Sequence, residues 1–169
     1  MKSIIFNTEE VKAILDRKKT QKRIICVPNE KIPEGKYEMR KDPVYNKWVM
    51  GDASCIMMGF FTTAHGWVDE ALGKCPYGKV GDRLWVRETW ADVNGTGIET
   101  IDGNEATHIY KAEEPWGDVW KEEWDGKWKP SVHMPRWASR ITLEITNIRV
   151  ERDEKKIWEW LIDFKVVKL

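Results

Sequence analysis

Apolar and polar residues alternate along several short stretches of the chain, at the period expected of strands with one buried face. The clearest stretch is 140–150, where apolar Ile141, Leu143 and Ile145 alternate with polar residues. Residues 158–167 alternate in a similar way after a charged turn, so we expect these two strands to pair. Shorter strands are expected at 3–6, 24–27, 47–50, 54–61, 83–88 and 107–111.

One segment near the N-terminus follows the helical period instead. Asn7 can cap a helix, Glu10 follows at the spacing of a capping box, and apolar residues then recur every three to four positions. We therefore predict a helix over 8–18. Several short strands with one clear helix indicate an α+β or mainly β fold, with 1–169 forming a single domain.

Two long stretches lack a regular pattern over most of their length. Residues 28–70 are charged and interrupted by prolines and glycines, so we expect an insertion that contains a hairpin. Residues 92–127 are expected to form a second insertion. Residues 92–105 are rich in Gly, Asn and Asp and predict a mobile loop, whereas the tryptophan-rich stretch at 115–130, which extends past the end of this insertion, predicts an ordered loop or lid.

The composition is that of a soluble globular protein, with 41% apolar and 33% charged residues. The 28 basic residues balance the 28 acidic ones, so affinity for phosphate requires a local cluster. No secretory signal or membrane-spanning run is found, and we expect a cytoplasmic protein without a membrane partner. The three separated cysteines fit buried, reduced thiols, although Cys75 with His65 leaves a zinc site as an alternative. We expect the protein to use neither a metal nor a cofactor.

Tryptophan is the outlier in this composition, with 11 residues. Large aromatic rings fill protein cores, and they also stack on nucleic-acid bases. Either use predicts that some of these rings are buried and others are partly exposed.

A run of cations follows the predicted helix and suits the negative end of its dipole. This basic turn offers six candidate ligand-binding residues, which are Lys18, Lys19, Thr20, Gln21, Lys22 and Arg23. The alternative interpretation is a solvated, charged end of the helix.

The stretch 129–140 contains two prolines that stiffen a loop rich in polar side chains. Its guanidinium groups can bind phosphate or a base edge, and its indole can stack. The candidate ligand-binding residues are His133, Arg136, Trp137, Ser139 and Arg140. The alternative is a packed loop whose arginines pair with acidic residues elsewhere.

A third group lies at the end of the strand predicted over 83–88. Arg87 and Trp90 are candidate ligand-binding residues, and Glu88 is a candidate acid or base. Because neighbouring side chains of a strand face opposite sides, one charged member should point inward. An internal Arg–Glu pair is the structural alternative. Elsewhere the chain has no P-loop, GxGxxG, HExxH or GxSxG motif.

Three strings, in this order, resemble phage and prophage members of the ASCH family. They are RKKTQKR at 17–23, CPYGKVGDRLWVRETW at 75–90 and KPSVHMPRWASRITLEITNIRVER at 129–152. The resemblance implies a small PUA-like β-barrel with an N-terminal helix and a central cleft. It also implies a superfamily whose members bind RNA, modified bases or nucleosides, but function still has to be argued from the site.

One enzymatic branch of the family hydrolyses the acetyl amide of N4-acetylcytidine with a Lys, a Thr and a Glu. Lys19 matches that Lys, but Lys22 stands where the branch has its Thr, and no residue after Val150 matches its Glu. If such an amidohydrolase operated here, Lys19 would be the nucleophile or proton shuttle, with a carboxylate such as Glu88 as the base.

Three hypotheses follow from these patterns. The first is a binding module for RNA, a nucleotide or a modified nucleoside, in which cations of the two basic groups engage phosphate and Trp137 or Trp90 stacks on a base. The second is the amidohydrolase. The third is a phage accessory protein that inhibits a host defence enzyme through a protein partner, suggested by the resemblance and by the tryptophans of 115–128.

Overall fold

The structure is a computed structural model that describes residues 1–26, 75–99, 103–113, 126–152, 154–155 and 157–168, together with the backbone of two strands at 37–41 and 48–52. The chain divides into two compact units, each assembled from separate stretches. The first unit contains 1–19, 84–143 and 166–169, and the second contains 20–83 and 144–165.

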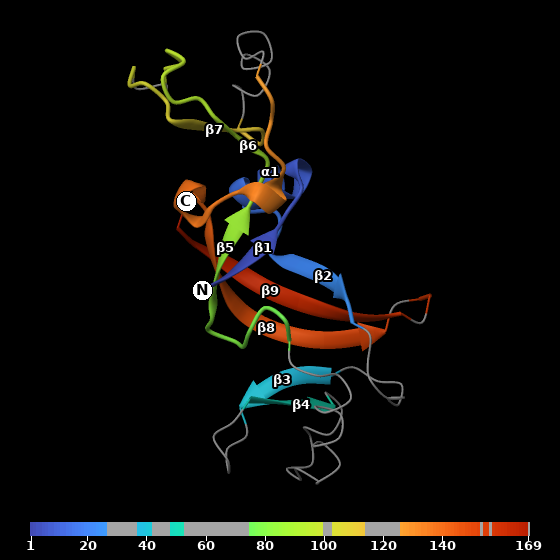
Figure 1. The fold of residues 1–169 in the computed structure, drawn as a ribbon. Helices are drawn as coiled ribbons and strands as arrows, with labels where there is room; N and C mark the ends of the chain where they lie inside the picture. Colours follow the sequence, from blue (N-terminus) through green and yellow to red (C-terminus); the bar gives the residue numbers. More distant parts are fainter. Residues whose placement is uncertain are drawn as a thin grey trace. The chain divides into compact units, whose positions relative to one another are not determined.

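In its described residues, the first unit combines short strands, one helix and two 3-10 turns. Strand β1 (Lys2–Ile5) runs parallel to β5 (Arg83–Arg87), as Figure 1 shows, and Ser3 lies opposite Trp85 in the register of the pair. Strands β6 (Trp90–Asp92) and β7 (His108–Tyr110) form a separate antiparallel pair. The 3-10 turns η2 (Ser131–His133) and η3 (Arg136–Ala138) precede β8 (Thr142–Arg152), whose first residues belong to this unit.

Both ends of helix α1 (Thr8–Leu15) are set by local bonds. Asn7 and Glu10 form the expected capping box at its N-terminus. At the other end Arg17 adopts a left-handed φ of 58°, and the N–H groups of Arg17 and Lys18 donate back to the carbonyls of Ile14 and Ala13. This Schellman-type ending stops the helix at Leu15, so our prediction of an end at residue 18 is wrong by one turn.

The β6–β7 pair is buried on both of its faces. Ala91 and Ile109 lie opposite each other and belong to one apolar cluster. The neighbouring residues of the two strands belong to a second cluster, which consists of Trp90, Tyr110, Met134 and Ala138. The alternation of side chains along a strand explains this division. His108 therefore lies on the same face of β7 as Tyr110.

The second unit is an antiparallel sheet. It contains β2 (Gln21–Ile25), β3 (Tyr37–Lys41), β4 (Trp48–Asp52) and most of β8 and β9 (Trp158–Lys168), in the order β2-β9-β8-β3-β4. Gln21 lies opposite Asp163, and Tyr37 lies opposite both Asp52 and Val150. One face of β9 is apolar, since Trp160, Ile162 and Phe164 are buried at alternate positions.

Strand β8 changes the phase of its alternation in the middle. Ile145 is buried, but the next buried residues are Ile148 and Val150, so the buried positions change from odd to even numbers. The side-chain oxygen of Asn147 accepts the N–H of Ile148 at 2.9 Å. A shift of this kind is what one extra residue in a β-bulge produces. This explains why the sequence pattern alternates only imperfectly after Ile145.

The observed elements confirm a mainly β fold with an N-terminal helix. The strands expected at 3–6, 83–88, 107–111, 140–150 and 158–167 are present within two residues at each end, and the last two pair as predicted. The hairpin expected within 28–70 is β3–β4. Residues 54–61 and 115–125 lie outside the described residues. Among the described strands, the pairings of neither unit close into a barrel.

Two further expectations concern membrane-spanning segments and the cysteine thiols. No helix in the described ranges is both long and apolar enough to cross a membrane. Cys26 and Cys75 are buried and form no disulfide among the described residues, as expected of reduced thiols, and burial raises the pKa of the Cys26 thiol. Cys55 and His65, on which the zinc alternative depends, lie outside the described residues.

Candidate functional site

The loop at 129–140 is built from two 3-10 turns, each introduced by a proline. Pro130 and Pro135 have φ angles of −58° and −77°, close to the value that the proline ring imposes. Between and after the turns, Met134 and Ala138 are completely buried, with 0% of their surface exposed. Three of the loop residues that we predicted to bind a ligand are exposed, which are His133, Arg136 and Trp137.

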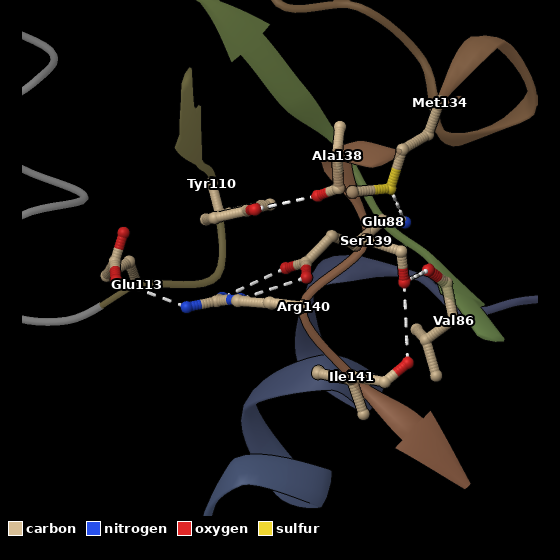
Figure 2. A network of polar contacts seen from close by, with 9 residues as sticks. All are labelled: Val86, Glu88, Tyr110, Glu113, Met134, Ala138, Ser139, Arg140 and Ile141. Carbon is tan, nitrogen blue, oxygen red and sulfur yellow. Dashed lines mark hydrogen bonds and ion pairs between the residues drawn. The ribbon is translucent and has the colours of Figure 1, made fainter. Parts of the chain in front are cut away.

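Strand β5 and the residue after it hold the middle of this loop. The Arg87 Nε donates a hydrogen bond to the Met134 carbonyl at 3.3 Å, and the Glu88 N–H lies 3.3 Å from the Met134 sulfur. At the end of the loop the Ser139 hydroxyl donates to the Val86 carbonyl at 2.7 Å (Figure 2). Arg87 and Ser139, which we predicted as ligand-binding residues, therefore both bond to backbone carbonyls within the first unit.

Arg140 is the centre of a polar cluster behind the loop. Its Nε and Nη2 donate to the two carboxylate oxygens of Glu88, each at 3.1 Å, and its Nη1 donates to Glu113 at 3.1 Å (Figure 2). Its guanidinium carbon lies 4.1 Å from the centroid of the Tyr110 ring. The two-pronged geometry matches the strongest class of Arg–carboxylate pairs.

The charges of this cluster are unequal, because two carboxylates surround one guanidinium. Burial raises the pKa of Glu88, although the hydrogen bonds from Arg140 oppose that rise. Burial also raises the pKa of Tyr110. For Arg140, burial alone acts to lower the pKa, but the hydrogen bonds and charge of Glu88 outweigh it and raise the pKa overall. When Glu88, Glu113 and Arg140 are all ionised, the cluster is thus a partly buried centre with one excess negative charge.

This geometry bears on the catalytic role that we considered for Glu88. The side chain is 1% exposed, and both of its oxygens already accept hydrogen bonds from Arg140. A general base needs an oxygen within reach of the proton that it removes. The arrangement favours the structural interpretation of an internal ion pair, with Arg140 rather than the neighbouring Arg87 as the partner.

Trp137 is the most exposed large apolar side chain of the described residues, at 68%. Its ring centroid lies 5.7 Å from that of Trp90 and 5.8 Å from that of His108, with interplanar angles of 89° and 82°. His108 in turn contacts Tyr110 at 5.4 Å and 88°. Edge-to-face contacts are favourable for aromatic pairs. The exposed ring is therefore supported from the side of the protein by two other rings.

Trp90 is almost completely covered, with 3% of its surface exposed. The Nζ of Lys129 lies 4.8 Å from the centroid of its ring, and Lys129 also lies 3.6 Å from a carboxylate oxygen of Asp92. In the described part of the structure its indole N–H is buried without a hydrogen-bond partner. Trp90 therefore supports Trp137, and its own ring is not available for stacking on a ligand.

The structure divides the predicted basic turn between the two units. In the first unit, Lys18 pairs with Asp16 at 2.8 Å, which raises the pKa of Lys18, and Lys19 lies 3.4 Å from a carboxylate oxygen of Glu10. Thr20 begins the second unit, where its carbonyl accepts the N–H of Phe164.

The rest of the basic turn is a strand. We expected the strand to begin at Ile24, but β2 already begins at Gln21, because the whole segment pairs with β9. Gln21 donates to Asp163 at 2.7 Å, and Arg23 pairs with Glu159 at 3.2 Å. Lys22 is partly buried within the same strand. The predicted cluster of cations is thus divided: Lys18 and Lys19 pair with carboxylates near the end of the helix, and Arg23 pairs with a carboxylate across the sheet.

Sequence reasoning missed three residues that organise the site, which are His108, Tyr110 and Glu113. Two of them were detectable, since His108 and Tyr110 are separated by one residue and so share a strand face. Nothing in the sequence pattern marks Glu113, because its role depends on Arg140, 27 residues later. Among the residues that the structure describes, no group of His, Cys, Asp and Glu is arranged to hold a metal ion.

The site is therefore an exposed indole on a clamped loop, with an exposed arginine beside it in the chain and a buried polar cluster behind it. Comparison of the chain with protein-family models, curated proteins and solved structures finds no match for it.

Proposed function

We propose that the first unit is a binding module for a nucleic-acid base or nucleoside, with Trp137 as the surface on which the base stacks. The observation that carries the proposal is the exposure of the Trp137 ring, at 68%, together with its support by Trp90 and His108. Leaving a large aromatic ring in water forgoes the free energy of its burial. A base stacked on such a ring recovers part of it, at about 1–3 kcal/mol per base.

The rigidity of the loop supports binding of this kind. Two prolines begin its turns, and Arg87, Ser139 and Arg140 hold its backbone or its flanks. Binding loses affinity when it must first order the groups that make contact. A ring that is already held needs little further ordering when a base arrives.

Charge supports the same proposal. Arg136 is exposed, and within the described residues its guanidinium takes part in no ion pair or hydrogen bond. A guanidinium in water beside a stacked base can engage the phosphate or the base edge. Arg23 and Gln21 already have partners in the second unit, so we assign them no direct role in binding.

We prefer the binding module to the amidohydrolase because of the geometry around Glu88, the candidate catalytic base. Both oxygens of Glu88 are occupied by Arg140, and Lys19 contacts Glu10 instead. Membership of the ASCH family, a PUA-like arrangement of the strands and a cytoplasmic location belong to the same proposal. Single-stranded RNA and modified nucleosides are its preferred ligands, because an unpaired base has a free face for stacking.

The test is binding of fluorescently labelled single-stranded RNA homopolymers, followed by anisotropy, with nucleosides followed by tryptophan quenching. Trp137→Ala is expected to weaken binding about 5- to 100-fold, which corresponds to the loss of one stacked base. Val132→Ala is the matched control, because Val132 is a 50% exposed apolar residue of the same loop. Equal loss in both variants would contradict a specific role for the indole.

The same samples discriminate the other two hypotheses. Incubation with N4-acetylcytidine, followed by mass spectrometry, would reveal deacetylation, and its loss in Lys19→Ala would replace the binding module by the amidohydrolase. If the wild-type protein neither binds the RNAs and nucleosides nor releases acetate, the proposal fails, and a protein partner becomes the hypothesis to pursue.

A further inference from the structure

Strand β7 contacts the exposed Trp137 in two ways. The His108 ring lies edge-on to the Trp137 ring at 5.8 Å. Two residues further along the same face, the Tyr110 hydroxyl donates a hydrogen bond to the carbonyl of Ala138 at 2.7 Å (Figure 2). Ala138 directly follows Trp137 and ends η3. One strand therefore contacts both the ring of Trp137 and the backbone that carries it.

A three-residue 3-10 turn has little stability of its own. In η3 the Ala138 N–H bonds to the Pro135 carbonyl at 3.2 Å, and the Ser139 N–H bonds to the Arg136 carbonyl at 3.1 Å. The carbonyl of Ala138 lies in a completely buried residue, where a lost hydrogen bond is expensive. The hydroxyl of Tyr110 satisfies it, and so ties the C-terminal end of the turn to β7.

Tyr110 is itself held on several sides. It lies opposite Trp90 in the β6–β7 pair, and the guanidinium of Arg140 lies over its ring at 4.1 Å. Arg140 is fixed in turn by Glu88 and Glu113. Figure 2 shows the contacts of Arg140 with the two carboxylates and the hydrogen bond from Tyr110 to Ala138, and the ring contact between Arg140 and Tyr110 joins the two. The polar cluster thus ends at the residue next to Trp137.

We infer that Tyr110 is a positioning residue of the base-binding site: its hydroxyl fixes the backbone after Trp137 and so holds the exposed indole in the orientation that a base requires. This inference rests on the proposed function. Tyr110 is 8% exposed and is not expected to touch the ligand itself. Without its hydroxyl, the turn is expected to populate orientations of Trp137 that do not bind, and the apparent affinity falls with the competent fraction.

Tyr110→Phe removes one oxygen and keeps the ring against Arg140. We expect it to weaken binding of the labelled RNA homopolymers about two- to tenfold, the effect of losing one hydrogen bond. Tyr77→Phe is the matched control, since Tyr77 is a partly buried tyrosine of the second unit, and it is expected to leave affinity unchanged. Both variants are also made in a Trp137→Ala background, where Tyr110→Phe should have no further effect on binding.

A readout without ligand separates this inference from the proposed function. 5-Fluorotryptophan placed at position 137 alone gives one fluorine resonance, which we expect to shift or broaden in Tyr110→Phe and to stay unchanged in Tyr77→Phe. An unchanged resonance, or the same loss of affinity with and without Trp137, would overturn the positioning role. If the resonance responds but no RNA or nucleoside binds, the proposed function fails and the positioning of Trp137 by Tyr110 stands.

Thermal unfolding of each variant is measured first. Should Tyr110→Phe not fold, 4-aminophenylalanine at position 110 restores a hydrogen-bond donor on the same ring, and it is expected to restore both the fold and the wild-type fluorine resonance. Recovery of the fold with an altered resonance at position 137 would also overturn the inference.

Discussion

The two units use their cations differently. In the second unit three described basic side chains of the sheet pair with carboxylates of neighbouring strands: Arg23 with Glu159, Arg149 with Asp163, and Lys165 with Glu144. In the first unit Arg140 is buried among carboxylates, whereas Arg136 is exposed on η3 beside the exposed Trp137. The comparison teaches that a dense run of cations in a sequence can fold into paired side chains, whereas a single arginine of a loop, Arg136, has no ion pair among the described residues.

The largest difference between the units is expected on removal of a single arginine. Arg140→Met leaves Glu88, which is 1% exposed, without its cation. We expect a loss of about 3–5 kcal/mol in the free energy of unfolding, the usual result of breaking a buried ion pair from one side. Urea denaturation at neutral pH, followed by circular dichroism, measures it.

Arg83→Met is the matched control in the second unit, because Arg83 is 60% exposed and lies 3.9 Å from Glu144. It should lose less than about 1 kcal/mol. Equal losses in the two variants would show that Arg140 contributes no more to stability than a surface cation.

The next expected effect is an opposite pH dependence of the stability that two carboxylates, Glu88 and Glu144, contribute. Burial raises the pKa of Glu88 above its ordinary value of 4.5, so its contribution to stability is fully present below that value and is lost as the pH rises through the raised pKa. The hydrogen bond from Lys165 lowers the pKa of Glu144, so its contribution is present above the ordinary value and is lost as the pH falls through the lowered pKa.

Unfolding free energies of wild type, Glu88→Gln and Glu144→Gln across this pH range test that contrast. The advantage of wild type over Glu88→Gln should shrink as the pH rises above 4.5. The advantage over Glu144→Gln should shrink as the pH falls below 4.5. Parallel curves for the two variants would remove the distinction between the buried Glu88 and the partly exposed Glu144.

A smaller effect is expected in ligand binding. Arg136→Gln should weaken binding of the RNA homopolymers and reduce the slope of log affinity against log salt concentration by about 0.7, the loss of one phosphate contact on a single strand. Arg23→Gln, in the second unit, should change neither quantity. Anisotropy titrations at several salt concentrations give both values, and a matching change in Arg23→Gln would move the site toward β2.

The smallest effect concerns the exposed pair on the second unit's sheet. A double-mutant cycle on Arg23 and Glu159, 3.2 Å apart with Arg23 58% exposed, should yield a coupling of about 0.2–1 kcal/mol. Chemical denaturation of the four proteins measures it. A coupling well above this range would mean that the pairing in the second unit is as strong as that around Arg140.

Local patterns predicted most of the regular structure of the described residues. The capping box at Asn7 and Glu10 began the helix as expected, because those bonds form within one turn. The strands at 140–150 and 158–167 were recognisable because alternate side chains meet the core and the solvent. The start of β2 at Gln21 was not recognisable, since polar residues there become a strand only by pairing with β9. The helix end was not recognisable either. Its left-handed residue is Arg17, and the sequence lacks the glycine that usually marks such a position.

The sequence predicted the loop that carries the candidate site, but not the role of each of its residues. The sequence pointed to 129–140 and 87–90, and the structure brings these stretches together through Arg87 with Met134 and Arg140 with Glu88. The sequence could not tell which arginine of the loop is exposed, because Arg136 and Arg140 have the same side chain. Their difference comes from Glu88 and Glu113, which reach Arg140 only in the folded chain.

By itself, then, the sequence determined the mainly β class, the helix and its cap, and the loop that carries aromatic and cationic side chains. These depend on periodicity and on contacts between residues close in the chain. The tertiary structure decided that Trp90 is buried while Trp137 is exposed, and that the basic run is divided and paired. Burial and ion pairing depend on neighbours tens of residues away in the chain, such as Tyr110 for Ala138 and Glu159 for Arg23, and those neighbours are set only by folding.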